Sequence, residues 1–461
     1  MTTTSAPAVG PQAVAGGPAA TPPAATPPAA RRVGTLSDIV RLALPALGSL
    51  VAEPAFLLAD SAMVGRLGAD PLAGVALAAT ILAALVNACV FLAYATTSSA
   101  ARSIGAGDRD GALRAGIDGV GLGLVLGVVL AAVVAATAPE AVHLLGGTGG
   151  IAAQAVRYLR ISALGLPGIL VATAATGVLR GLRRSRTVLT VVTCGFAVNT
   201  ALNAELVFGA RWGVAGSAWG TVIAQTAMGT ALAAVVARDS ARRRLSLRLH
   251  PAGMMRAARA GVALVVRTVT MRSVIVVLAG AAATLGAAPL AAYQLGFSLW
   301  MFLALALDAV AIAAQTVVAG LLGAGEPRTA RIAVRRMTFA AVLAGTALGA
   351  VLWAAQPLYL GLLADQPAVR HALADSLPVI GLLQPLAAAV YVLDGVLIGA
   401  GDGRYLAWAG AGTAAAVIPA AGCVYHGSLT AVWAVFGVFL AVRVAFLGAR
   451  ARGDRWIRLG V

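Results

Sequence analysis

The chain of 461 residues is 60% hydrophobic and only 11% charged, with a mean hydropathy of +0.90. Soluble globular proteins are about 25% charged and about 45–50% apolar, so this composition excludes an ordinary soluble enzyme, a fibrous protein and a wholly disordered chain. The formal net charge is +17, and all 34 basic residues are arginine. We expect one polytopic membrane protein.

Residues 1–35 open the chain with Ala, Pro, Thr and Gly, which bury too little apolar surface to fold, so we expect a disordered tail. From residue 38 onward, apolar stretches alternate with short polar segments, and a membrane-spanning helix needs about 20 apolar residues. Strand-like alternation is rare, which favours helices over a β-barrel. The pattern predicts an all-α membrane protein with twelve transmembrane helices, at 38–63, 71–99, 114–137, 152–178, 187–209, 214–237, 261–286, 289–317, 333–355, 374–399, 404–424 and 428–449.

The arginines are distributed unequally between the two sides of these spans. With the N-terminus inside, 26 arginines fall in cytoplasmic segments, whereas five fall outside: Arg66, Arg157, Arg160, Arg211 and Arg370. Positive charge concentrates in cytoplasmic loops, so we expect an inner (plasma) membrane protein with both termini in the cytoplasm. The charge is scattered over many loops without interleaved aromatic residues, which argues against a nucleic-acid partner.

An internal repeat appears at a constant offset of 218 residues, which equals six predicted helices. Six is even, so both halves enter the membrane in the same sense, and the pattern predicts two six-helix bundles related by a pseudo-twofold axis along the membrane normal. We expect bundles at 36–237 and 261–450, a basic cytoplasmic linker at 238–260 and a cytoplasmic tail at 451–461. The matched segments are Leu67–Ala73 with Leu285–Ala291, Gly105–Asp108 with Gly323–Glu326, and Gly177–Gly181 with Gly395–Gly399.

Asp60 is the candidate ion-coupling residue. It lies about 33 Å along the first span, and Asn199 and Asn203 lie on one face of the fifth span at a similar depth. A carboxylate beside neutral amides in a low dielectric can take up a proton on one side and release it on the other. The alternative is that Asp60 caps its helix beside Arg66.

Three further groups in the spans are candidates. Glu53, which precedes Asp60, is a candidate for a second titrating group in the coupling. Pro54 follows it, and a proline bends its helix, either as a coupling or gating element or as a static kink. Arg267, Arg272 and Asp308 lie at matching depths in spans seven and eight, which predicts an ion pair that is either structural or part of the coupling. Asp394 either lines a cleft in the second half, as a candidate coupling or gating residue, or forms a polar contact with a neighbouring side chain.

Gln294, Trp300 and Tyr391 are candidate substrate-cleft residues in the second half, where aromatic side chains provide walls for flat cationic or lipophilic ligands. Packing against lipid or other helices is the alternative. The four histidines are scattered over different loops, and no metal-ligand spacing is present, so we expect no metal and no cofactor.

Several segments, taken together in order, resemble the multidrug and toxic compound extrusion (MATE) family, and the pattern is most similar to its DinF-like bacterial branch. The resemblance covers roughly residues 36–450 and rests on Leu42–Pro45 with Ala59–Gly68 for the first helix, and on Gly105–Asp108, Gly177–Leu182, Gly213–Ala218 and Gln384–Asp402 for later helices and loops.

The resemblance implies an antiporter that exports small, often cationic or amphipathic compounds in exchange for protons or sodium. We expect the protein to be a monomer. It also implies that Asp60 is the coupling residue, assisted by an asparagine and an aspartate four residues apart on helix five. Asn199 matches the first of these, whereas Asn203 stands where the aspartate is expected. The alternatives are a lipid-linked precursor flippase of the related superfamily and, from a different class, an integral membrane enzyme. Twelve spans and scattered histidines argue against both.

Overall fold

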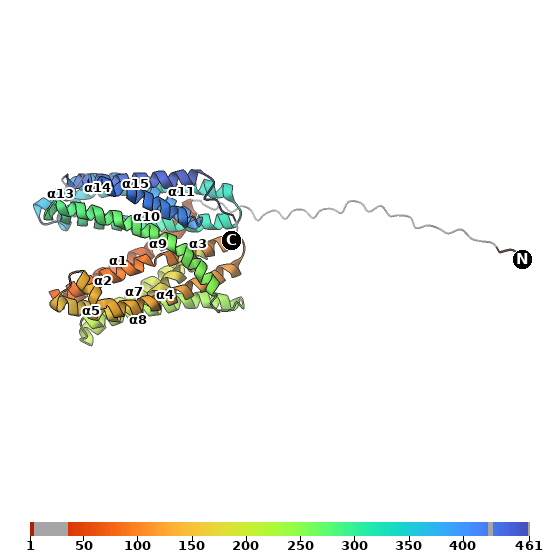
Figure 1. Cartoon of the computed structure of the whole chain (residues 1–461), viewed down its shortest axis with the longest axis horizontal. Coiled ribbons are helices and arrows are strands. Elements are labelled where there is room, and N and C mark those ends of the chain that lie inside the picture. The colour runs from red at the N-terminus through yellow and green to blue at the C-terminus, as the bar shows by residue number, and fades with distance from the viewer. Residues whose placement is uncertain (4–35, 423–426, 460–461) are drawn as a thin grey trace. The chain divides into compact units, whose positions relative to one another are not determined.

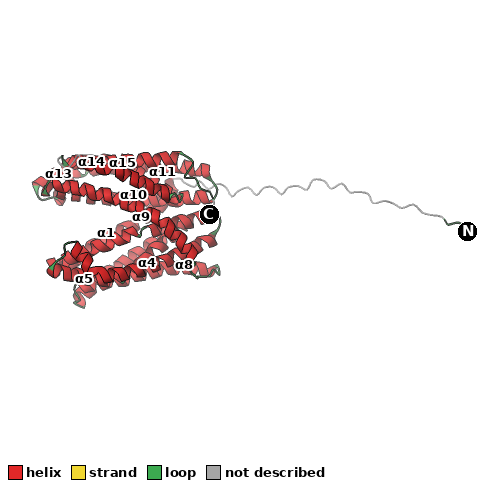
Figure 2. Cartoon of the chain, viewed as in Figure 1, coloured by secondary structure: helices red, strands yellow, loops and turns green. Residues whose placement is uncertain are grey.

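The computed structural model describes residues 1–3, 36–422 and 427–459, so most of the predicted tail at 1–35 lies outside the described residues. The described helices all lie in one compact unit and are joined by short loops, and no strand occurs among the described residues (Figure 2). The helices are α1 (Leu36–Gly65), α2 (Ala69–Ala88), α3 (Phe91–Gly105), α4 (Arg109–Leu144), α5 (Gly149–Ala163), α6 (Leu166–Gly181), α7 (Ser185–Ala204) with a π-helical turn η1 (Glu205–Gly209), α8 (Val214–Arg242), α9 (Pro251–Thr284), α10 (Ala287–Gly323), α11 (Pro327–Ala354), α12 (Gln356–Leu363), α13 (Pro367–Gly399), α14 (Gly403–Gly422) and α15 (Leu429–Arg452).

The predicted spans correspond to these helices. In the part of the chain that the structure describes, ten helical segments are long and apolar enough to cross a membrane, and the pair α5 and α6, bent by 51° at its break, adds an eleventh if it is one span. The twelfth predicted span corresponds to α14, whose 20 residues extend about 30 Å, the thickness of the hydrocarbon core. The all-α membrane architecture is confirmed.

The repeat is visible in the backbone itself. α2 and α10 begin 218 positions apart, as do α4 and α11, and α6 and α13 end 218 positions apart. Gly68 and Gly286, which precede α2 and α10, have φ angles of 122° and 111°, a conformation that side chains with a Cβ rarely adopt. The two halves therefore share helix boundaries and turn geometry, although their sequences match only in short segments.

The repeats differ in where their helices break. The first half is interrupted between α2 and α3, at Cys89 and Val90, and between α5 and α6, at Leu164 and Gly165, whereas α10 and α13 are continuous. The second half is instead interrupted at Ala355, between α11 and α12. A common plan thus accommodates different local bends.

Each half is built around one central helix. In the first half α6 packs against α3, α4 and α8, and in the second half α13 packs against the equivalent α10, α11 and α15. Figure 1 shows α10, α11, α13 and α15 gathered in one bundle. The equivalence extends to the outer helices, because α1 packs on α7 and α9 packs on α14. Of the predicted linker at 238–260, only residues 243–250 lie outside helices, since α8 and α9 continue into their arginine-bearing ends.

The halves meet where α3, α6, α10 and α13 end, which we call the arginine-rich end. A Cβ on Gly105 would overlap the backbone of Gly320, and a Cβ on Gly323 would overlap the backbone of Arg102. The two contacts are related by the same 218-residue offset. Because equivalent ends of α3 and α10 cross at one end of the unit, the axis relating the halves runs along the helices, as the sequence predicts.

Side chains strengthen this junction. The Gln315 amide donates to the Tyr94 carbonyl at 2.7 Å, and the Ser98 hydroxyl donates to the Ile398 carbonyl at 2.9 Å. Arg102 donates to the Ala400 carbonyl at 2.8 Å. Each bond joins the first half to the second, so the halves are held together at the arginine-rich end.

Candidate functional site

Asp60 lies in a polar contact among three helices of the first half. Its side chain is 5% exposed, five residues before the end of α1. Oδ1 of Asp60 accepts hydrogen bonds from Nδ2 of Asn203 on α7 and from the hydroxyl of Ser217 on α8, both at 2.7 Å. All three residues lie toward the end of the helices opposite the arginine-rich end.

The packing of α1, α7 and α8 explains why these groups meet. Phe56, one turn before Asp60, stacks on Phe196 of α7 with ring centroids 5.3 Å apart. On α8, Gly220 faces Asn203, and a Cβ at this position would overlap the Asn203 amide oxygen. The aromatic stack and the missing side chain together bring the Asn203 amide within hydrogen-bonding distance of Asp60.

Several buried polar atoms near Asp60 have no hydrogen-bond partner among the described residues. Asn199, one turn from Asn203, is fully buried, and neither its amide nitrogen nor its oxygen has a partner among the described residues. The Asn203 amide oxygen and the Thr221 hydroxyl are likewise buried without a partner there. Since buried polar groups are normally hydrogen-bonded, this cluster is a candidate site for a ligand or an ion.

Sequence reasoning missed three members of this cluster. Ser217 was noted only as part of a motif, and Thr221 and Tyr158 were not singled out. Tyr158, on α5, is 5% exposed and lies beside Asp60, Ser217 and Thr221. Hydroxyl residues are common in membrane helices, so only the three-dimensional packing separates these three from the rest.

Glu53 and Pro54 do not join the Asp60 cluster. Glu53 lies two turns before Asp60 on α1 and is exposed. Pro54 lies inside α1, which is one helix from Leu36 to Gly65 despite this proline and Pro45.

The predicted ion pair in the second half forms with a different acid. Asp394 on α13 accepts from Arg267 of α9 at 2.7 Å and from Arg443 of α15 at 2.8 Å. Arg443 is fully buried and Asp394 is 4% exposed. The cluster therefore carries two arginines against one carboxylate, in a helix-packed environment.

The predicted pairing of Arg267 and Arg272 with Asp308 is corrected by this arrangement. Among the described residues Asp308 has no salt bridge, and Arg272 is exposed. The reason is that α9 packs chiefly on α14 rather than on α10, the next helix in sequence. Arg267 consequently faces α13 and α15. Asp394 forms ion pairs with neighbouring side chains, which is one of the two alternatives that the sequence offers for it.

The predicted substrate-cleft residues do not form one surface. Trp300 is 4% exposed and packs in an aromatic cluster, with its ring centroid 4.8 Å from that of Phe436 and 6.5 Å from that of Trp433. Gln294 is exposed and Tyr391 is half-buried. Trp300 thus belongs to the core of the second half, because α15 covers it.

Within the described residues, no group of three His, Cys, Asp or Glu side chains is placed to hold a metal ion. The Asp60 cluster offers a single carboxylate with amide and hydroxyl groups around it. That chemistry can bind a proton or coordinate a small cation with oxygen ligands.

Comparison with known proteins identifies the family. The MatE family profile matches the chain twice, over residues 45–204 and again over 262–420, one match in each half. The chain belongs to the MatE family. Family membership agrees with the resemblance seen in the sequence, and the two matches agree with the repeat in the backbone. The protein is therefore a membrane transporter of the MATE type, a family of multidrug efflux transporters.

Relatives of known name cover between 47% and 88% of this MATE transporter. It is 30% identical over 386 residues to Protein DETOXIFICATION 44, chloroplastic, of Arabidopsis thaliana, covering 80% of this chain and 73% of that protein. It is 29% identical over 427 residues to DNA damage-inducible protein F of Escherichia coli K12, covering 88% and 90%. A probable multidrug resistance protein NorM of Pseudomonas putida is 29% identical over 221 residues, covering 47% and 45%.

Solved structures share the fold. A crystal structure of a MATE protein in a bent conformation superposes with a TM-score of 0.82 at 21% identity, covering 91% of this chain and 95% of that one. A structure described as the outward-facing conformation of a multidrug resistance MATE family transporter gives a TM-score of 0.81 at 21% identity, covering 91% and 96%. At these identities the likeness concerns the fold.

Proposed function

We propose that this MATE transporter is an antiporter in which Asp60 carries the coupling ion, a proton or sodium, against the export of small, often cationic or amphipathic compounds. The observation that carries the proposal is the Asp60 cluster. It combines one nearly buried carboxylate at membrane depth with unpartnered amide and hydroxyl groups on neighbouring helices. Ionisable groups at such depth usually serve an ion or substrate pathway.

The two-half architecture supports alternating access. The halves are joined at the arginine-rich end by backbone crossings and hydrogen bonds, and Asp60 lies toward the opposite end. Rocking of one half against the other would transfer access between the two sides. The names of the relatives, which include a detoxification protein and a probable multidrug resistance protein, support export rather than an enzymatic role.

We also propose that the protein works as a monomer in the inner membrane with both termini in the cytoplasm. The arginine-rich end then faces the cytoplasm, in line with the bias of positive charge toward that side. A single cysteine at Arg248, in the loop between α8 and α9, tests this orientation. This cysteine should react with an impermeant maleimide only after the cells are permeabilised. Labelling of intact cells from outside would place the loop, and with it the arginine-rich end, outside the cell.

Reconstitution tests the function itself. The purified protein in liposomes is given an imposed pH gradient, an imposed sodium gradient or neither, together with a panel of fluorescent cations. We expect cation movement that depends on one of the two gradients. Transport that is equally fast without any gradient would rule out an antiporter.

A further inference from the structure

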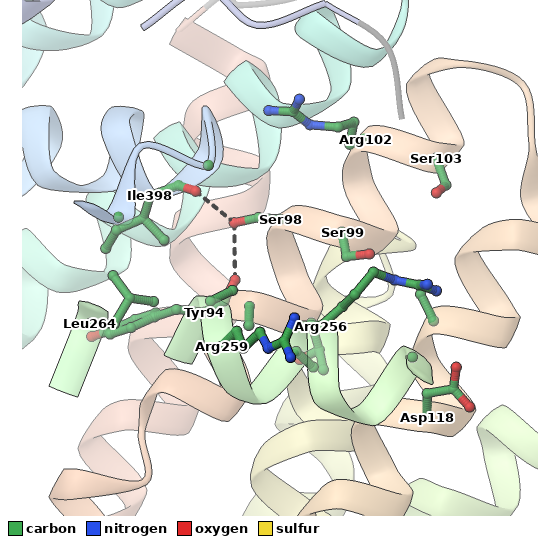
Figure 3. Close-up of a pocket in the computed structure, with 18 of the residues that line it drawn as sticks. Tyr94, Ser98, Ser99, Arg102, Ser103, Asp118, Arg256, Arg259, Leu264 and Ile398 are labelled. Carbon is green, nitrogen blue, oxygen red and sulfur yellow. Dashed lines mark hydrogen bonds between the residues drawn. The ribbon is translucent and has the colours of Figure 1, made fainter. Parts of the chain in front are cut away.

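A large cavity lies at the arginine-rich end, remote from Asp60. It has a volume of about 1250 Å³ and opens between α3 and α4 of the first half and α9 with the α13–α14 turn of the second. Figure 3 shows Arg256 and Arg259 on α9, together with Ser98, Ser99 and Arg102 on α3 and Asp118 on α4. The Ser98 hydroxyl, bonded to the Ile398 carbonyl, forms part of its inner wall.

The lining of this cavity is strongly cationic. Arg114, Arg256, Arg259 and Arg404 all line it, and all four are exposed. None of the four has a hydrogen bond or an ion pair with another described residue. They come from three helices, α4, α9 and α14, so the concentration of charge results from the fold rather than from one basic segment.

The acid in the lining is held by the start of α9. Asp118, the acidic residue in the lining, accepts a hydrogen bond from the backbone N–H of His250 at 3.0 Å and lies 3.5 Å from its ring. Gly253, one turn into α9, leaves room for this carboxylate, because a Cβ there would overlap it. Asp118 thus fixes the start of α9, and the four arginines outnumber this one carboxylate of the lining.

Apolar residues also line the cavity, beside the hydroxyl groups of α3. Leu264, Ile398 and Ala263 line it beyond the arginines, and Arg256 and Arg259 lie one to two turns along a helix whose later turns cross the membrane. A ligand that suits both parts carries a compact anion at one end and a hydrocarbon at the other. Guanidinium groups bind phosphate oxygens in pairs, which makes arginine well suited to a phosphate headgroup.

We propose that this cavity binds the phosphodiester headgroup of an anionic phospholipid from the leaflet at the arginine-rich end. Basic pockets between transmembrane helices on the cytoplasmic side are suited to such headgroups. A lipid seated there would contact α3 and α4 of one half and α9 and α14 of the other. It would therefore stabilise the arrangement in which the halves meet at this end.

Native mass spectrometry of the purified full-length protein tests the proposal. The protein is incubated with phosphatidylglycerol or phosphatidylcholine of the same acyl chains, and bound lipids are counted. We expect more phosphatidylglycerol than phosphatidylcholine on the wild type. Arg256→Gln with Arg259→Gln should lower phosphatidylglycerol occupancy roughly tenfold or more, since each arginine near an anionic headgroup contributes substantially.

The matched control is Arg335→Gln with Arg336→Gln. These two arginines are exposed on α11, about two turns from its start, and they do not line the cavity. This variant should keep wild-type occupancy. An equal loss in both double variants would show a general effect of surface charge and overturn the proposal.

Two further measurements keep the result decisive. Arg256→Lys with Arg259→Lys retains the charge, so it should keep more phosphatidylglycerol than the glutamine variant. If the glutamine variant is not monodisperse, the lysine variant is compared with the wild type in its place. Glycerol phosphate and inorganic phosphate form the second arm. Binding of these soluble anions without a preference for phosphatidylglycerol would assign the cavity to a soluble phosphate and refute the lipid site.

Discussion

Nδ2 of Asn203 donates a 2.7 Å hydrogen bond to Oδ1 of Asp60, joining α7 to α1 across 143 residues of sequence. The donor is a neutral amide, so the contact orients the carboxylate without adding a second titratable group. Asn199, one turn away, is fully buried with an unpartnered amide. The ion coupling that we propose therefore rests on a single acid of the first half, Asp60.

Asp60→Asn removes the ionisable group and keeps its size and its ability to accept from Asn203 and Ser217. We expect the protein to fold and to lose gradient-driven transport by more than about tenfold, because no other acid shares the cluster. Efflux from liposomes under an imposed gradient measures this. Glu140→Gln, at an exposed acid near the end of α4, is the control and should transport normally. Wild-type transport by Asp60→Asn would exclude Asp60 from the coupling.

Asn203→Asp places a second carboxylate within hydrogen-bonding distance of the first. Two carboxylates this close cannot both ionise readily, so the pair should retain one shared proton under conditions in which Asp60 alone releases it. We expect the pH profile of transport to move toward alkaline pH. Asn199→Asp, one turn away and without a hydrogen bond to Asp60, should produce a smaller displacement. Identical pH profiles for wild type and Asn203→Asp would contradict the shared-proton argument.

The sequence predicts the architecture well because helix length, arginine bias and the 218-residue offset are each properties of the chain itself. The common depth of Asp60 and Asn203 is also predictable, since depth along two helices can be counted at 1.5 Å per residue. That α1 and α7 pack against each other is a result of the fold. The break at Cys89 and Val90 is not predictable in this way, because neither residue is a proline or a glycine.

The sequence does not determine which of several side chains at similar depth contact each other. Arg267 has acids at similar depth on more than one helix, and the packing of α9 on α14 selects Asp394 over Asp308. Trp300 suits a cleft or a core equally well until α15 places Phe436 and Trp433 against it. Depth can be counted from sequence, whereas the angular direction of a side chain depends on which helices become neighbours.

The Asp394 cluster predicts an order of stabilities. Asp394→Asn leaves the Arg267 and Arg443 guanidinium groups facing each other without a counter-charge, and removing one partner of a buried ion pair costs about 3–5 kcal/mol. Arg443→Met leaves a balanced pair of Arg267 and Asp394, so it should cost less. The unfolding temperature of each variant in detergent, monitored by size-exclusion chromatography after heating, measures the two losses of stability.

The double variant and an exposed pair provide the controls for this order. Asp394→Asn combined with Arg443→Met lowers the uncompensated charge and should recover part of the loss. Asp454→Asn breaks the exposed contact with Arg331 and should change the unfolding temperature little. If Arg443→Met were the more damaging single change, charge balance would not be the principle that stabilises this cluster.

The crossing of α3 and α10 predicts how the halves can be separated. Gly105→Ala introduces a Cβ that meets the backbone of Gly320, and a backbone cannot move aside as a flexible side chain can. The arginine-rich end should therefore open more often. The readout is maleimide labelling of Ser98→Cys, with Cys89, Cys194 and Cys423 replaced by alanine, because Ser98 bonds across the junction to Ile398.

Labelling of Ser98→Cys should rise several-fold in Gly105→Ala and in the equivalent Gly323→Ala, whose Cβ meets the backbone of Arg102. Gly448→Ala is the control, since a Cβ there has nothing within 4 Å. Both interface variants should respond alike because the 218-residue repeat makes their contacts equivalent. Unchanged labelling in both variants would mean that the α3–α10 crossing does not close this end in the membrane. Other contacts would then hold the two halves together.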